Sequence, residues 1–467
     1  MIRRLFASQL RVNMISGTAV ALVNIGVLAI AYPLYLHFLG YEQYGLWLVL
    51  SAVLSFAQLG DLGIGQAVMK LVAEEYGRDD LRAVQEYMTS AIVILAVSGA
   101  VVFALIVLFN GQIVNLLRLS EENALVVSWM LPYIACLSIY VFIVQAVNAM
   151  LSGFGRMDLA NYAQTSGRFV AVLVAGSLLS LGAGIKGLLI GSAVSYVFIH
   201  IASLVFIRHI APVRVVRISN LSVRRMKRLF GFGSGVLGSS LLCMLLSPFN
   251  KLMLSRCAGV ASIPIYEIAY TGSMQIRGLV EAGIRALMPE VSRLGANMTD
   301  QAAMRILEIN RRSVGLIIRF ALPLYGVLIL GAQLLLQIWL GSKFVESLPS
   351  ALRIALVGSL LSLACVPAYY LLLGMGRVRH CFMNQAILAG TNALLVLVFA
   401  WMGNHLSLRE VLVSTLVGMA LSSAYTILQN WRMLHEISVS ITAGKESRKE
   451  CQVGISRHLY AHYIQDT

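Results

Sequence analysis

The amino-acid sequence predicts an all-α polytopic membrane protein with about twelve transmembrane helices in two pseudo-symmetric six-helix bundles. Hydrophobic residues make up 58% of the 467 residues and charged residues only 12%, whereas an ordinary soluble domain carries roughly 25% charged residues. Apolar runs of about 20 residues, the length that crosses a bilayer as a helix, recur along the whole chain. Two short motifs also repeat at nearly one interval, which divides these runs into two related sets.

Twelve apolar runs are long enough to span a membrane. Glycines, prolines and clusters of charge separate them. They cover residues 14–38, 44–68, 88–110, 125–150, 160–182, 186–207, 230–254, 262–288, 313–340, 350–374, 381–403 and 409–431. Because the first run is too long for the apolar core of a signal peptide and further runs follow it, we expect it to be the first membrane anchor.

Basic residues are concentrated in alternate loops, and the net charge is +15. The loops of one side include Lys70, Arg78, Arg156 and a dense basic segment at 208–228, whereas the opposite loops are short and hold one or two basic residues each. Lys and Arg are enriched in cytoplasmic loops. We therefore expect both termini in the cytoplasm, and we do not expect nucleic acid as a partner, since the basic residues form no single face.

Two motifs recur about 220 residues apart. Gly-Phe-Gly-Arg at 153–156 ends the fourth span, and Gly-Met-Gly-Arg at 374–377 ends the tenth, at an offset of 221. Asp-Leu-Gly-Ile at 61–64 lies in the second span, and Glu-Ala-Gly-Ile at 281–284 lies in the eighth, at an offset of 220. Repeats separated by six spans have the same membrane orientation. This layout is typical of transporters whose substrate path lies between two parallel repeats.

The spans and the repeat predict four parts of the chain. Residues 1–207 form an N-terminal six-helix bundle, 208–229 a basic cytoplasmic linker, and 230–433 a C-terminal six-helix bundle. Residues 434–467 form a polar cytoplasmic tail without a long apolar run, which we expect to be poorly ordered or to lie on the surface.

The sequence contains no motif of a common enzyme class. It has no phosphate-binding loop with its lysine, no Gly-x-Ser-x-Gly and no His-Glu-x-x-His. Its six cysteines form no Cys-x-x-Cys pair and lie mostly in or beside apolar runs, as free thiols do. We therefore expect neither an enzyme nor a resident cofactor or metal.

Charged residues inside the spans are the candidate site, since each costs about 2.5–3.5 kcal/mol at a helix centre and usually faces a cavity or a partner. One stripe of the eighth span carries two acids and two arginines among residues three or four positions apart. Its members are Glu267, Tyr270, Met274, Arg277, Glu281 and Arg285. The stripe is either a cavity wall or a ladder of i,i+4 ion pairs, and both can hold. Arg285 can also extend to the membrane interface.

Other spans hold further candidates. Asp61 and its repeat counterpart Glu281 are candidates for coupling transport to an ion gradient, although a carboxylate at 61 could also be held by neighbouring groups in a structural role. Arg168 and Arg319 lie about a third of the way into the fifth and ninth spans, and Arg353 lies near an outer end. Each lines a cavity or extends to the interface. The proposed substrate-binding cations are Arg277, Arg168, Arg319 and Arg285, which together would form a basic lumen suited to phosphate oxygens.

Three stretches resemble polysaccharide flippases. Leu39–Trp47 reads Leu-Gly-Tyr-Glu-Gln-Tyr-Gly-Leu-Trp, 61–66 reads Asp-Leu-Gly-Ile-Gly-Gln, and 70–77 reads Lys-Leu-Val-Ala-Glu-Glu-Tyr-Gly. In that family a short outer loop ending in Tyr-Gly leads into the second span, which closes near Ala-Glu-x-x-Gly. The Leu-x-Gly-x-Gly-Arg at 151–156 is similar to the family's small-residue turn. The chain thus resembles, up to about residue 433, the O-antigen flippases of the multidrug/oligosaccharidyl-lipid/polysaccharide exporter superfamily.

This resemblance implies a MATE-like fold and a protein of the bacterial inner membrane. It implies a flippase that turns polyprenyl-pyrophosphate-linked oligosaccharide over by alternating access, for lipopolysaccharide or other surface polysaccharide biosynthesis. Its implied partners are the lipid-linked oligosaccharide, membrane lipids, and a polysaccharide polymerase with chain-length machinery. Related lipid flippases use basic residues in a central cavity, which Arg277 matches in kind only, because no motif maps it.

Three alternatives remain at this point. A cation-coupled drug or metabolite exporter of the same superfamily predicts an acidic cavity, whereas these spans hold more arginine than acid. A major-facilitator transporter predicts Gly-x-x-x-Asp-Arg-x-Gly-Arg after the second span, but residues 69–78 read Met-Lys-Leu-Val-Ala-Glu-Glu-Tyr-Gly-Arg. A membrane-embedded glycan polymerase or ligase predicts large outer loops, and the outer loops here are short.

Overall fold

The computed structural model describes the backbone of residues 2–57, 63–211, 221–285, 291, 294, 299–402 and 406–465. It also describes their side chains, with the exception of those at 2–18, 232–241, 243, 282, 283, 285 and 440–465. The secondary structure of these residues is helical, and no strand occurs among them. The predicted all-α class is therefore confirmed.

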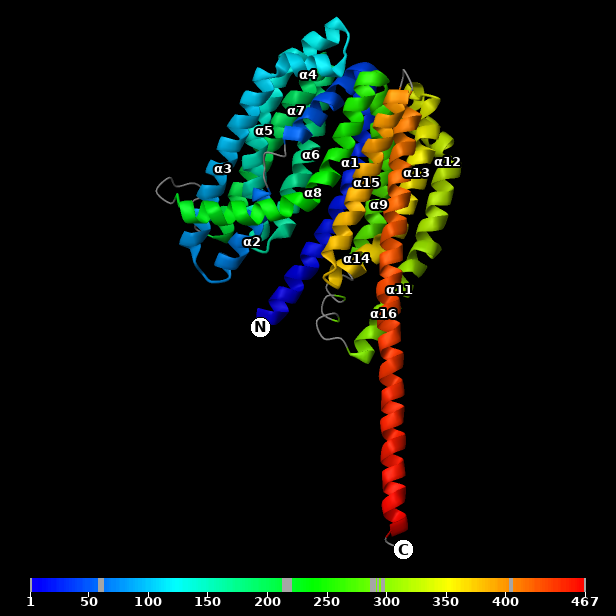
Figure 1. The fold of residues 1–467 in the computed structure, drawn as a ribbon. Coiled ribbons are helices and arrows are strands. Elements are labelled where there is room, and N and C mark those ends of the chain that lie inside the picture. The colour runs from blue at the N-terminus through cyan, green and yellow to red at the C-terminus, as the bar shows by residue number, and fades with distance from the viewer. Residues whose placement is uncertain are drawn as a thin grey trace.

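The first half of the chain forms one bundle (Figure 1). Its helices are α1 (Ile2–Ala57), α2 (Ile64–Tyr76), α3 (Leu81–Leu108), α4 (Asn110–Leu117), α5 (Glu121–Gly153), α6 (Met157–Ser180) and α7 (Ile185–Ile210). In α1, Gly40 has φ 68° and ψ −177°, so two helical segments meet at a sharp turn. A left-handed φ is strained for a residue with a Cβ, and glycine avoids this strain.

The second half forms the other bundle. It contains α8 (Val223–Cys257), α9 (Ser262–Arg285), α11 (Asp300–Leu316), η3 (Ile317–Ala321), α12 (Leu322–Leu340), η4 (Gly341–Lys343), α13 (Ser347–Ala364), α14 (Val366–Gly374), α15 (Val378–Met402) and α16 (Leu408–Gln465). In Figure 1, α1 and α8 run between the two groups of helices. Helix α16 continues through most of the predicted tail, 434–467, as far as Gln465. No proline interrupts this stretch of the sequence.

Eight helical stretches of the described residues are long and apolar enough to cross a membrane. They are Ala19–Ser55, Leu81–Leu108, Glu121–Gly153, Ile185–Ile210, Asp300–Lys343, Ser347–Gly374, Val378–Met402 and Leu408–Val439. The first of them covers most of the predicted span 14–38 and the first part of the predicted span 44–68, on either side of Gly40. Helices α6, α8 and α9 coincide with the other three predicted spans and are more polar. Large apolar side chains face outward, such as Trp401 at 88% and Leu330 at 82% exposed, as expected of a lipid-facing surface.

The repeated Gly-x-Gly-Arg motif forms the same helix end in both halves. Gly155 has φ 77° and Gly376 has φ 76°. The Arg156 amide donates to the Leu151 carbonyl at 3.1 Å, and the Arg377 amide donates to that of Leu372 at 2.9 Å. Each is a Schellman motif, in which a residue with left-handed φ lets the chain turn back on the last helical carbonyls. The repeat therefore has a structural basis at this position.

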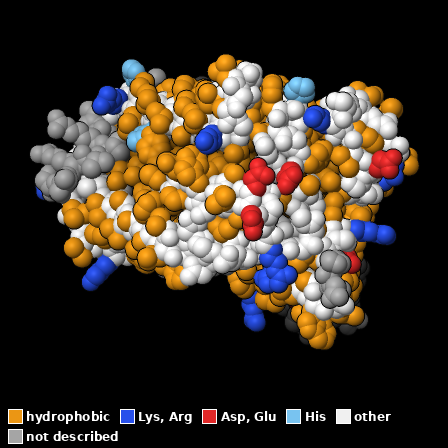
Figure 2. Space-filling view, turned by 90° about the horizontal axis from the view of Figure 1, so that it is seen from above, with side chains coloured by type: hydrophobic (Ala, Val, Ile, Leu, Met, Phe, Trp, Pro, Cys, Tyr) orange, Lys and Arg blue, Asp and Glu red, His pale blue; other side chains and the backbone are white. Residues whose placement is uncertain are grey.

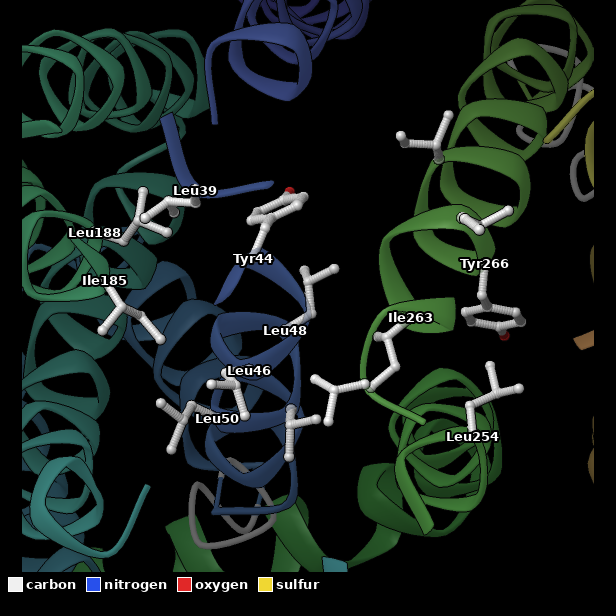
Figure 3. Packing of buried hydrophobic residues seen from close by; sticks show 14 of the residues in the cluster. Leu39, Tyr44, Leu46, Leu48, Leu50, Ile185, Leu188, Leu254, Ile263 and Tyr266 are labelled. Carbon is white, nitrogen blue, oxygen red and sulfur yellow. The ribbon is translucent and has the colours of Figure 1, made fainter. Parts of the chain in front are cut away.

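The two bundles share one hydrophobic core at the end opposite the C-terminus. Tyr44 and Leu48 of α1 lie in one cluster with Leu254 of α8 and with Ile263 and Tyr266 of α9 (Figure 3). Toward the other end the cores separate. One cluster of α2, α3, α5 and the start of α8 belongs to the first half, and two clusters around α11 to α16 belong to the second. Apart from the start of α8, which packs on the first half, the halves are thus packed together at one end.

We call this shared region the seam, and define it by Tyr32, Tyr41, Tyr44 and Gly45 of α1 together with Val260, Ile263, Tyr266 and Lys343. Seen from the seam end, hydrophobic side chains are spread over much of the described surface, with a group of acidic side chains near its middle and further acidic side chains toward one edge (Figure 2). A Cβ on Gly45 would overlap the backbone carbonyl of Val260. Glycine at this position therefore permits the close contact between α1 and the turn before α9.

Candidate functional site

Each half encloses a cavity among its own helices. The N-half cavity has a volume of about 510 Å³ and lies between α2, α5, α6 and α7. The C-half cavity has a volume of about 330 Å³ and lies between α8, α9, α15, α16 and the junction of α13 with α14. Polar cavities inside otherwise apolar bundles are the expected places for substrate and ion sites in transporters.

The two cavities are equivalent positions of the internal repeat. Six residues of the first correspond to six residues of the second at one offset of 221 positions. The pairs are Val144 and Cys365, Gln145 and Val366, Asn148 and Tyr369, Ala149 and Tyr370, Gln164 and Gln385, and Arg168 and Ala389. The same helix faces thus build both cavities, with different side chains on them.

Among the described residues that line the N-half cavity, Arg168 is the charged one. It projects from α6, where Gly167 allows α7 to approach closely, since a Cβ there would overlap the side chain of Ile199. The Ser195 hydroxyl donates to the Gly167 carbonyl at 2.7 Å and fixes this contact. The other polar lining residues are neutral amides and hydroxyls, among them Gln145. No carboxylate of the described residues is paired with Arg168.

The C-half cavity contains an ion pair. The Arg277 Nη1 lies 3.0 Å from the Glu281 Oε2, and the two side chains are 24% and 15% exposed. The Tyr370 hydroxyl donates to the Glu281 Oε1 at 2.7 Å. The Arg277 Nε is buried and has no hydrogen-bond partner among the described atoms. Arg277 and Glu281 therefore line a cavity and also pair with each other, whereas Glu267 of the same stripe does not line this cavity.

The sequence-based candidates do not gather in one lumen. Arg168 and Arg277 lie in separate cavities. Arg319 lies on η3 between Ile318 and Phe320, which are 60% and 64% exposed, and lines neither cavity. The predicted single basic lumen thus differs from the observed arrangement. Periodicity indicates which residues share a helix face, but it does not indicate which helix packs against that face.

Of three further candidates, the structure describes the side chain of Arg353 but not those of Asp61 and Arg285. The Arg353 Nε donates to the Ile329 carbonyl at 3.1 Å and is not among the residues that line either cavity. Asp61 and the side chain of Arg285 lie outside the described residues. Of the two coupling candidates, the structure therefore places Glu281 alone.

A buried ion pair near the seam was not predicted. The Lys251 Nζ of α8 lies 2.8 Å from the Glu267 Oε2 of α9, and the side chains are 11% and 13% exposed. Glu267 was noted on the polar stripe, but Lys251 was not. A lysine within the apolar run 230–254 was the available signal, since a buried ammonium needs a partner.

A charged cluster joins the start of α8 to the first half. Arg225 contacts Glu75 and Glu86, each at 3.3 Å, and donates to the Tyr87 hydroxyl at 3.1 Å. Arg228 contacts Glu74 at 2.9 Å. The predicted linker 208–229 thus ends in helix, and the first turns of α8 pack on α2 and α3.

The fold and the paired cavities define a multi-pass membrane protein with the architecture of MOP-superfamily transporters. A multidrug resistance MATE family transporter in its inward-facing conformation has a TM-score of 0.71 at 15% identity, over 93% of this chain and 99% of that chain. An outward-facing MATE transporter scores 0.60 at 15% identity, over 91% and 96%. A MOP transporter from Pyrococcus furiosus, described as having a binding pocket of reverse polarity, scores 0.60 at 13% identity, over 91% and 96%.

The chain belongs to the polysaccharide biosynthesis protein family, whose model matches residues 10–294. A Shigella flexneri protein named as an O-antigen transporter is 24% identical over 359 residues, which are 75% of this chain and 80% of that protein. The expected superfamily and the expected class, a transporter rather than an enzyme, are confirmed.

Proposed function

We propose that the protein is a flippase for polyprenyl-pyrophosphate-linked oligosaccharide in the bacterial cytoplasmic membrane. Membership of the polysaccharide biosynthesis family and the similarity to an O-antigen transporter support this substrate class. The observation that carries the proposal is the pair of equivalent polar cavities, each containing a guanidinium, inside bundles with apolar outer faces. A polymerase and chain-length machinery would act on the translocated product.

The charges of the cavities suit an anionic lipid headgroup. Arginine stays protonated and binds phosphate oxygens in a bidentate manner. In a low-dielectric bundle such a charge attracts an anion much more strongly than it does in water. The prenyl chain would remain in the bilayer beside the exposed apolar helix faces, so that only the headgroup and sugars enter the protein.

Alternating access between the halves supplies the movement. The seam closes one end, and the cores of the two halves are separate toward the end that holds the termini. Because the basic loops favour a cytoplasmic position for the termini, the seam would face the outside and the protein would be open inward. The higher TM-score with the inward-facing relative, 0.71 against 0.60, supports this assignment.

Purified protein in proteoliposomes tests the flippase proposal. Translocation of a fluorescently labelled lipid-linked glycan is measured by quenching from outside. We expect Arg168→Ala and Arg277→Ala each to lower the rate by about ten-fold or more, because a charge-assisted hydrogen bond contributes about 1.5–3 kcal/mol. Arg311→Ala, at an exposed site on α11, is the matched control. Unchanged rates in both cavity variants would exclude these residues as the headgroup site.

Ion coupling is assigned to Asp61 and Glu281. The contacts of Glu281 with Arg277 and Tyr370 would change when the carboxylate takes up a proton or a cation. Translocation is measured with imposed proton or sodium gradients, in the unmodified protein and in Asp61→Asn and Glu281→Gln. We expect a gradient to accelerate translocation and each variant to abolish that acceleration. Rates that ignore both gradients would contradict the coupling role.

The MATE-like fold favours a second candidate, a cation-coupled exporter of drugs or metabolites. This function predicts transport of a cationic dye by the same proteoliposomes. The two candidates are separated by competition, since an exporter of cations would transport ethidium with no effect of added lipid-linked glycan. We expect no ethidium transport above that of empty vesicles, because no unpaired carboxylate is present among the lining residues described in either cavity.

A further inference from the structure

The charged cluster at the start of α8 holds more positive than negative charge. A cavity there is bordered by the guanidiniums of Arg78, Arg224, Arg225 and Arg228, the carboxylates of Glu75 and Glu86, and the hydroxyls of Tyr87 and Ser222. Three of the guanidiniums share the Glu75 carboxylate, at 3.3, 3.4 and 3.6 Å. With four guanidiniums and two carboxylates, the described residues that border this cavity have a formal charge of +2.

The surrounding sequence leaves this surplus positive. Residues 70–87 and 208–228 together contain ten basic and five acidic residues. Residues 212–220, which lie outside the described part of the chain, contribute two of the basic residues and no acid. An anionic ligand is therefore favoured at this cavity.

Guanidinium donors remain for such a ligand. Arg224 is exposed and forms no ion pair with a described residue. Arg225 contacts Glu75 through Nη1 and Glu86 through Nε, which leaves its Nη2 group unused by the described carboxylates. A guanidinium carries five N–H donors in a planar arrangement that fits phosphate oxygens. The cavity thus offers phosphate-binding groups beyond those used in its own ion pairs.

The cavity lies near the level of lipid headgroups. Helix α3 has 28 residues and is about 42 Å long, whereas the hydrocarbon core of a bilayer is about 30 Å thick. The first turns of α3 therefore extend into the headgroup layer, and Glu86 and Tyr87 lie in the second turn. In Figure 1 the first turns of α8 lie across the helices of the first half rather than along them, as helices in a membrane interface do.

The start of α8 also exposes an apolar face beside the cavity. Val223 and Phe230 are 67% and 47% exposed, and they share a face of the helix because they are seven positions apart. Leu229 is buried against the first half on another face. A ligand that combines a phosphate with apolar chains would cover this face as well as fill the cavity.

We propose that this cavity binds the phosphodiester headgroup of an anionic glycerophospholipid, whose acyl chains lie beside Val223 and Phe230. Such lipids are present in the cytoplasmic leaflet, the side on which we expect the basic loops. The bound phosphate accepts hydrogen bonds from Arg224 and Arg225, neutralises the surplus charge and holds the start of α8 against the first half. The site is separate from the two half-cavities, and it does not depend on the proposed substrate.

Native mass spectrometry of the full-length protein tests this proposal. The probe is dioleoyl phosphatidylglycerol, and the reference is dioleoyl phosphatidylcholine, which has the same acyl chains and no net charge. We expect the anionic lipid to bind about five-fold more tightly or better, and Arg224→Gln to remove most of this preference. Lys227→Gln is the matched control, because Lys227 is exposed on the same helix and does not border the cavity; it should keep the preference.

Thermal unfolding gives a second measurement. Phosphatidylglycerol should raise the midpoint of the unmodified protein and of Lys227→Gln, and raise that of Arg224→Gln less. Equal losses of lipid binding in Arg224→Gln and Lys227→Gln would indicate diffuse attraction and overturn the proposal. Inorganic phosphate that bound as tightly as the lipid would assign the cavity to a soluble anion instead. Tighter binding of geranyl pyrophosphate than of phosphatidylglycerol, lost in Arg224→Gln, would assign it to the transported substrate, and either result would also overturn the proposal.

Discussion

The hydroxyl of Tyr41 donates a hydrogen bond of 2.8 Å to the backbone carbonyl of Lys343 and so joins the two halves of the protein at the seam. The indole of Trp339 makes a second such contact, at 2.8 Å, with the carbonyl of Ala29. Both carbonyls belong to the backbone, so these contacts depend on the position of the helices. Opening of the seam must break both of them, together with the apolar packing around Tyr44 and Ile263.

A methyl group on Gly45 should force the seam open. A Cβ there overlaps the Val260 carbonyl, and overpacking of this kind costs about 1–3 kcal/mol in the closed state. We expect Gly45→Ala to increase modification of Cys257, which packs against the seam, by about five-fold or more. The measurement uses a membrane-impermeant maleimide and a protein whose other cysteines are replaced by alanine. Gly26→Ala, also in α1 and with open space around its Cβ, should label at the original rate, and equal labelling of both variants would argue against a closed seam.

The repeated helix ends should require glycine equally in both halves. Gly155→Ala and Gly376→Ala each place a Cβ on a residue with φ near 77°, which costs about 1–2 kcal/mol. No other atom lies within 4 Å of either Cβ position, so the backbone alone causes the loss. We expect the thermal unfolding midpoint in detergent to fall for both variants. It should not fall for Gly326→Ala, because Gly326 is a helical glycine with similar open space around its Cβ position. A loss in one half only would mean that the two turns are not equivalent.

Arg225 should stabilise the attachment of α8 to the first half. Its guanidinium stacks on the Tyr87 ring at 4.6 Å and contacts Glu75, whose side chain is 5% exposed. Arg225→Ala leaves this carboxylate with weaker partners, and we expect a loss of about 1–3 kcal/mol, seen as a lower thermal midpoint. Arg225→Lys should lower the thermal midpoint less than Arg225→Ala does, because an ammonium keeps the charge but lacks the planar, two-pronged set of N–H donors of a guanidinium. Arg224→Ala, at an exposed position of the same cluster, should change little, and an equal effect there would indicate nonspecific charge loss.

The Lys251–Glu267 pair should show strong coupling in a double-mutant cycle. Removal of one partner of a buried pair leaves an uncompensated charge and costs about 3–5 kcal/mol. We therefore expect Lys251→Met and Glu267→Gln to lower the thermal midpoint singly, and the double variant to recover most of the loss. Additive losses would mean that the two groups are independent despite their separation of 2.8 Å.

The sequence predicted the features that depend on local spacing. The stripe of the eighth span predicted the Arg277–Glu281 contact, because residues four apart on a helix are neighbours. The glycine motif predicted equivalent turns at Gly155 and Gly376. In contrast, nothing in spacing alone indicated that Arg168 and Arg277 occupy separate cavities, since that separation follows from how each bundle closes on itself. The partner of Glu267 is on another helix and was missed for the same reason.

The docking of Arg225 and Leu229 onto the first half has a consequence for the integrity of the chain. The two bundles are held together by a helix that packs with both of them, in addition to the peptide segment before it. In a protein cut between residues 212 and 220, or made as two polypeptides separated there, the start of α8 would still be able to pack against the α2–α3 surface. The two fragments should therefore associate in the membrane and restore a working transporter without a covalent bond between them.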